Sequence, residues 1–114
     1  AMIIAGDVFD TGSPSNESLR MYYNFLVDLH KTGCRQVVII GGNHDSISTL
    51  NAPADLLKVF NVHVVGGVPA NRAEQVVLLH TKLGKPAAVV AAVPFLRDRD
   101  VRLSVPGETT VERS

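Results

Sequence analysis

Short apolar runs alternate with amphipathic stretches along the chain. Residues 2–5 and 37–40 are continuous apolar runs, each ended by glycine, as is typical of strands buried in a parallel sheet. Between them, apolar residues recur at three- and four-residue spacing, which predicts a helix with one apolar face. These residues are Leu19, Tyr22, Tyr23, Leu26 and Leu29. Ser13 and Pro14 are the predicted N-cap and first helical residue, and Gly33 is the predicted stop.

The same alternation continues in the second half of the chain. A second helix is predicted to begin near Asn51 and to run through Phe60, followed by a third strand at 62–65. Two further apolar runs, 76–80 and 87–93, flank a turn-like segment and predict a β-hairpin. The predicted fold class is therefore α/β: a β-α-β-α-β unit with parallel strands, followed by a hairpin.

Composition fits one modest domain. The chain has 114 residues, of which 46% are hydrophobic and 19% charged, and its formal net charge is zero. A neutral chain has no overall attraction for nucleic acid, which argues against a simple DNA-binding module. The single Cys34 cannot form an internal disulfide, which fits a reducing cytoplasm, and no apolar run is long enough to predict a membrane span. From residue 97 onward we expect a poorly ordered tail.

Two polar turns carry the candidate chemistry. Gly6–Asp10 and Gly42–Asp45 each follow a predicted strand, and the distance between them along the chain is that of one βαβ unit. Both turns should therefore meet at the carboxyl ends of neighbouring parallel strands, where open α/β sheets bind their ligands. Carboxylate, amide and imidazole groups are ligands of divalent metal ions. The sequence thus predicts half of a metal site.

The two turns also resemble a known family. Gly-Asp-x-x-Asp followed by Gly-Asn-His-Asp is similar to the central pair of signatures of the calcineurin-like metallophosphoesterases. The segments at 9–12 and 46–51 resemble, more narrowly, the DNA nucleases of that family. The family's opening Asp-x-His and later Gly-His-x-His signatures do not occur in these 114 residues. The resemblance therefore implies a single partial metallophosphoesterase sandwich over 1–114, without the family's first strand and the C-terminal part of its fold.

The resemblance implies a role for each polar residue. Asp7 corresponds to the carboxylate that bridges two metal ions, and Asn43 to a ligand of the second ion. His44 is expected to face the phosphate, where it stabilises transition-state charge or protonates the leaving oxygen. Asp45 is expected to hold the His44 ring in the correct tautomer. Asp10 either lines the site, contacting the substrate or supporting the ligands, or only caps the turn.

The implied activity is hydrolysis of DNA phosphodiesters with two divalent ions, Mn²⁺ being the family's usual preference and Mg²⁺ the alternative. Such nucleases trim DNA ends and open hairpins in repair and recombination, as homodimers joined to a large coiled-coil ATPase. Two rival interpretations stay open: a phosphoesterase for phosphomonoesters or nucleotides, and a truncated binding protein without chemistry. With only two ligands, we expect these 114 residues alone to bind metal weakly, to be inactive, and to self-associate through the exposed edge at 2–5.

The remaining candidates have weaker signals. His30 is predicted to have a surface or helix-capping role, and His63 and His80 to be structural, because none has a partner motif. Cys34 is predicted to pack as a small apolar side chain. Arg97 begins a mixed-sign run that is predicted to be a solvated face, with contact to a phosphate backbone as the alternative.

Overall fold

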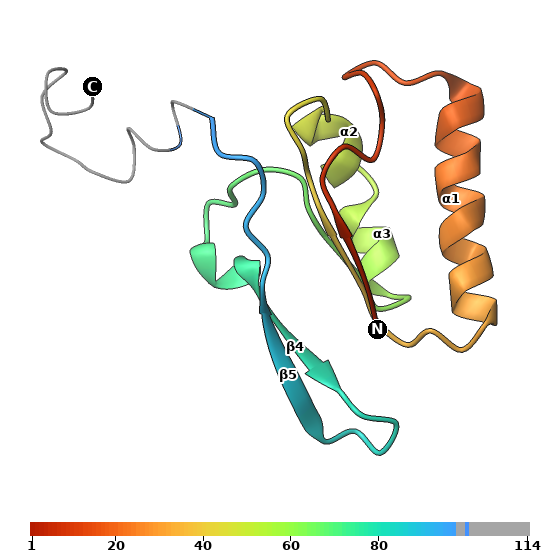
Figure 1. Ribbon diagram of the computed structural model, residues 1–114, viewed down its shortest axis with the longest axis vertical. Coiled ribbons are helices and arrows are strands. Elements are labelled where there is room, and N and C mark those ends of the chain that lie inside the picture. Colours follow the sequence, from red (N-terminus) through yellow and green to blue (C-terminus); the bar gives the residue numbers. More distant parts are fainter. Residues whose placement is uncertain (98–99, 101–114) are drawn as a thin grey trace, which may run out of the picture.

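A parallel three-stranded sheet forms the centre of the protein. The computed structural model describes residues 1–97 and 100. Strands β1 (Met2–Ala5), β2 (Val37–Ile40) and β3 (Val62–Val65) lie in the order β1-β2-β3, all parallel (Figure 1). Together with the helices and the hairpin below, this arrangement confirms the predicted α/β class.

The first helix begins two residues later than the sequence pattern indicates. Helix α1 (Asn16–Lys31) has Ser15 as its N-cap, and the Ser15 side chain accepts a hydrogen bond of 3.1 Å from the Ser18 backbone N–H. Ser13 lies before the helix, in the preceding loop, where its N–H donates to the Thr11 hydroxyl at 3.3 Å. The cap is the residue whose oxygen reaches a free N–H of the first turn, and that residue is Ser15.

Replacing Ser15 by alanine should therefore lower the free energy of unfolding by about 1 kcal/mol, since one N–H of the first turn loses its acceptor. Urea unfolding followed by circular dichroism measures the change. Ser13→Ala is the matched control and should leave the midpoint unchanged. Equal losses from the two substitutions would show that Ser15 is not the cap.

The predicted second helix is divided into two. Helix α2 (Ile47–Asn51) begins after its N-cap Ser46, and α3 (Ala54–Lys58) follows Pro53. The prediction of one helix starting near Asn51 was wrong because Pro53 has no N–H to continue the bonding of α2. The Asn51 side chain instead accepts a hydrogen bond of 3.1 Å from the Gly66 N–H, which ties the end of α2 to the end of β3.

A short 3₁₀ helix, η1 (Arg72–Gln75), leads into the predicted hairpin. Strands β4 (Val76–His80) and β5 (Pro86–Ala91) pair antiparallel, with an irregularity at Leu79/His80. The second strand ends at Ala91 and not at Val93, because the chain after it leaves the hairpin and runs toward the carboxyl end of β2. The predicted tail falls largely outside the described residues.

Each face of the sheet has its own apolar cluster. Val37 and Ile39 of β2 pack with the three helices, which lie together on one side of the sheet (Figure 1). Val38, whose side chain alternates to the other face, packs with Val77 and Ala92 of the hairpin segment. Strand β2 is thus buried on both faces, which explains its uninterrupted apolar sequence.

Strand β1 lies at an edge of the sheet. Within the described residues it pairs only with β2, and Ile3 is 53% exposed. Among the residues that the structure describes, no helix has both the length and the apolar character needed to cross a membrane.

Candidate functional site

The turn after β1 has an unusual backbone. The Gly6 N–H donates to the Ile40 carbonyl at 2.8 Å, which continues the pairing of β1 with β2. Gly6 and Asp7 then both have positive φ angles, 83° and 43°. Glycine adopts this left-handed region freely and aspartate tolerates it better than most residues. The bend places the Asp7 carboxylate at the carboxyl edge of the sheet, with its side chain 46% exposed.

The turn after β2 lies directly against Asp7. The His44 N–H donates to Asp7 Oδ1 at 3.1 Å, and His44 Nδ1 lies 3.6 Å from Asp7 Oδ2. A Cβ at Gly42 would collide with the Asp7 backbone nitrogen and with Asp7 Oδ1, so only glycine allows the two turns to approach this closely. The prediction that the two polar turns meet at this edge is confirmed.

A buried carboxylate joins the two turns. Asp45 is 3% exposed, and its oxygens accept three backbone N–H groups, those of Val8 at 3.0 Å, Phe9 at 2.9 Å and Gly42 at 2.8 Å. Three donors compensate a carboxylate for the water it loses on burial. Asp45 therefore holds the first turn, which carries Asp7, against the second.

This placement of Asp45 differs from the expected contact with the His44 ring. In the described part of the chain, the hydrogen bonds of the Asp45 carboxylate all go to backbone N–H groups, whereas the His44 imidazole lies beside Asp7. The catalytic assignment of both residues stays a prediction. Sequence spacing carries no signal for the structural task of Asp45, because its donors lie mainly on a different turn far along the chain.

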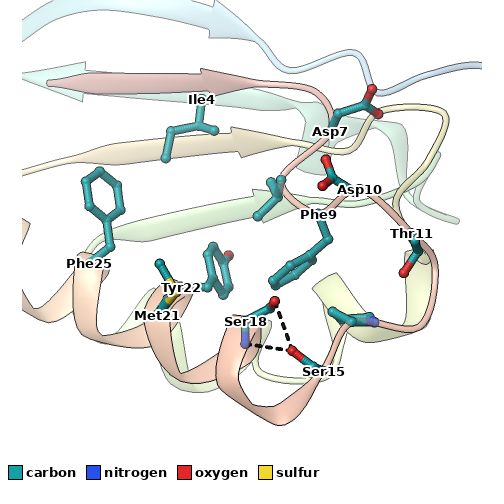
Figure 2. A pocket seen from close by; sticks show the side chains of 12 residues that line it. Ile4, Asp7, Phe9, Asp10, Thr11, Ser15, Ser18, Met21, Tyr22 and Phe25 are labelled. Atoms are coloured by element: carbon teal, nitrogen blue, oxygen red, sulfur yellow. Dashed lines mark hydrogen bonds between the residues drawn. The ribbon is translucent and has the colours of Figure 1, made fainter.

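A groove of about 710 Å³ extends from Asp7 along β1 and α1. Figure 2 shows Asp7 and Asp10 at one end of it, and Met21, Tyr22 and Phe25 of α1 along its length. One end of the groove is thus acidic and the remainder is largely apolar. Asp10 is exposed there, which leaves both of its predicted roles open.

Tyr22 lies beneath the groove and was predicted only to pack. Its ring meets Phe9 edge-on, with centroids 5.4 Å apart. Burial raises the pKa of the Tyr22 hydroxyl, and the neighbouring Tyr23 and Asp45 raise it further. Its buried oxygen has no hydrogen-bond partner in the described structure.

The histidines outside the two turns lie elsewhere. The His30 ring packs edge-on against Phe60, with centroids 5.6 Å apart. Burial, together with the charge of Lys58, lowers the pKa of His63. His30 is exposed near the end of α1, as a surface role requires, and the C-cap of that helix is Thr32. The structural role of His63 stays a prediction.

The donor set at the sheet edge suits a hard divalent cation in part. Asp7 supplies a carboxylate and Asn43, exposed in the second turn, supplies an amide oxygen. Oxygen donors are the ligands that Mn²⁺ and Mg²⁺ prefer. Across residues 1–97 and 100, no three His, Cys, Asp or Glu side chains gather as a metal cluster. Asp7 and Asn43 therefore fit an oxygen-rich metal site, of which they would supply some of the ligands.

Comparison with known proteins agrees with this geometry. The family model described as calcineurin-like phosphoesterase matches residues 1–104. The chain belongs to the calcineurin-like phosphoesterase family. Among the curated phosphoesterase relatives, SbcD of the nuclease SbcCD from Escherichia coli K12 is 43% identical over 113 residues, which cover 99% of this chain and 27% of that protein.

Other family members of the same name are also similar. The SbcD protein of Rhodobacter capsulatus is 37% identical over 109 residues, covering 89% of this chain, and that of Bacillus subtilis is 36% identical over 66 residues, covering 58%. The predicted resemblance to the nuclease branch of the phosphoesterases is confirmed. The chain spans about a quarter of the length of the E. coli and R. capsulatus relatives, 27% and 26%.

Proposed function

We propose that the chain carries part of the active site of a metal-dependent DNA nuclease of the SbcD type. The observation that carries this proposal is the contact of Asp7 with His44 at the carboxyl edge of a parallel sheet. An exposed carboxylate and an exposed imidazole there can serve a phosphate together. The family and the printed names of the relatives, which are components of the nuclease SbcCD, support the reaction class.

Each residue of the site then has a task. Asp7 and Asn43 would hold two divalent ions, Mn²⁺ or Mg²⁺, together with ligands from other parts of the full-length protein. When bound, these ions would neutralise the phosphate charge and lower the pKa of a water molecule. His44, 59% exposed beside Asp7, would donate to the phosphate or leaving oxygen. Asp45 keeps the two turns in register, and Asp10 lines the substrate groove.

The full-length protein would act as an exonuclease and as an endonuclease on hairpins and single strands, in DNA repair and recombination in the cytoplasm. Its partner would be an SbcC-like subunit, as the name of the SbcCD complex suggests. The family resemblance implies that this partner is a large coiled-coil ATPase. A homodimer is also part of the proposal. An apolar groove of about 440 Å³ between α1 and α3 supports it, lined by Tyr23, Val27, Leu56 and Phe60 among others. The exposed edge of β1 is the alternative surface for self-association.

The deciding experiment is Mn²⁺-dependent cleavage of end-labelled DNA by the full-length protein that contains this chain. His44→Ala should lower the rate by between about 10² and 10⁴, the usual contribution of a general acid. His80→Ala is the matched control and should cleave at the wild-type rate, because His80 lies at the far end of β4. The 114 residues alone should not cleave, because they supply only two of the ligands.

Other outcomes would redirect the proposal. Preferential hydrolysis of a small phosphomonoester would identify a different phosphoesterase, and a full-length protein without any hydrolysis would indicate a binding protein. Cleavage by the 114 residues alone, if lost in His44→Ala, would show that the site needs fewer ligands than we count.

A further inference from the structure

The segment after β5 returns to the candidate site. The Ala92 N–H donates to the Gln75 carbonyl, and the Phe95 N–H donates to the Gly41 carbonyl at 2.9 Å. Gly41 follows β2 directly and precedes the turn that carries His44. The chain therefore crosses the carboxyl end of β2 a few residues before Arg97.

Arg97 contacts the His44-bearing turn directly. Its Nη2 donates to the backbone carbonyl of Asp45 at 3.2 Å, and its guanidinium carbon lies 5.7 Å from the centroid of the Phe95 ring. The Arg97 side chain is half-buried, and Nη1 is shielded from solvent. The charged residues around Arg97 predict a solvated side chain. This prediction was wrong, because the guanidinium donates to the Asp45 carbonyl and lies over the Phe95 ring.

Asp45 is therefore held by hydrogen bonds to both its side-chain carboxylate and its backbone carbonyl. Its carboxylate binds the backbone of Val8, Phe9 and Gly42, and its carbonyl accepts from Arg97. A hydrogen bond from a charged donor is about twice as strong as one between neutral groups. Since Asp45 immediately follows His44, the position of this peptide fixes where the imidazole can lie.

We propose that Arg97 is a positioning residue for His44, acting through the Asp45 carbonyl and not through DNA. The proposal rests on the proposed function, because it assigns His44 the task of serving the phosphate. A displacement of about 1 Å in a catalytic group can lower a rate a hundredfold. Loss of Arg97 should consequently reduce kcat while the affinity for DNA is kept.

The test compares three variants of the full-length protein in Mn²⁺-dependent DNA cleavage. Arg97→Gln should lower kcat by about ten- to a hundredfold, with KM for DNA changed by less than about twofold. Arg97→Lys keeps the positive charge and can still donate a hydrogen bond to the Asp45 carbonyl, and it should recover most of the rate. Arg72→Gln removes the same charge from an exposed position on η1 and should cleave as wild type does.

A direct contact to DNA would give the opposite result. In Arg97→Gln, KM for DNA would then rise and kcat would be kept. The slope of log binding affinity against log salt concentration would become less steep by about one, since one phosphate contact is lost. That result, or wild-type kinetics for Arg97→Gln, overturns the proposal while leaving the proposed function intact.

Hydrogen exchange supplies a readout that does not need activity. In Arg97→Gln, the amides of residues 42–46 should exchange about tenfold faster than in wild type and in Arg72→Gln, while those of β3 should be unchanged. Unchanged exchange at 42–46 overturns the proposal even if the full-length protein proves to be inactive on DNA. Should Arg97→Gln fail to fold, Arg97→Met takes its place, because it keeps an unbranched side chain and loses the donor to the Asp45 carbonyl. A fall in kcat with KM kept, or faster exchange at 42–46, supports the proposal, and wild-type values in both measurements overturn it.

Discussion

Replacing Asp7 by asparagine should lower the rate of DNA cleavage by the full-length protein by about a thousandfold while the fold is kept. Asparagine tolerates the left-handed φ of 43° at this position, and its amide oxygen can still accept the His44 N–H. The substitution removes the negative charge and replaces the second carboxylate oxygen by an NH2 group, which cannot bind a metal ion. Lewis-acid stabilisation by a bound ion is worth several kcal/mol, and each 1.36 kcal/mol corresponds to a tenfold change in rate.

The control for this substitution is Asp10→Asn, which removes the same charge from the same loop. Its rate should fall much less, because the carboxylate that meets His44 of the second turn is that of Asp7. Both variants should unfold at the wild-type urea midpoint, and isothermal titration with Mn²⁺ should show weaker binding only for Asp7→Asn. An equal loss of rate in the two variants would contradict the assignment of Asp7 as the metal ligand.

The sheet could be predicted from the sequence because its signals are local. Each strand of the sheet is a short, largely apolar run followed by glycine, and the length of one βαβ unit places the two polar turns at the same edge. The helix boundaries are less local. Ser15 and Ser46 are caps because their side-chain oxygens reach particular N–H groups. Several other serines lie nearby, and the sequence alone does not show which of them caps the helix.

The unpredicted parts of the site share one physical feature. Asp45 and Arg97 act through bonds from a side chain to backbone groups of segments far away in the sequence. A periodic pattern records which face of an element is buried, but any backbone N–H or carbonyl can take part in such a bond, whatever residue carries it. The family resemblance identifies both turns without specifying what holds them together.

Asp45→Ala should lower the free energy of unfolding by about 3 kcal/mol or more. The substitution leaves the N–H groups of Val8, Phe9 and Gly42 without their acceptor, and each buried N–H left unsatisfied costs about 1–3 kcal/mol. Urea unfolding of the full-length protein measures the loss, and Asp28→Ala, at an exposed carboxylate on α1, is the matched control with an expected change below about 0.5 kcal/mol.

The same variant separates the two roles considered for Asp45. If it served only to orient the His44 ring, its removal would lower the cleavage rate and leave the unfolding midpoint unchanged, as Asp7→Asn is expected to do. The three backbone bonds instead require that stability and rate fall together, because the loop that carries Asp7 separates from the turn that carries His44. Asp45→Asn, which keeps one acceptor oxygen in place of two, should lie between wild type and Asp45→Ala in both measurements.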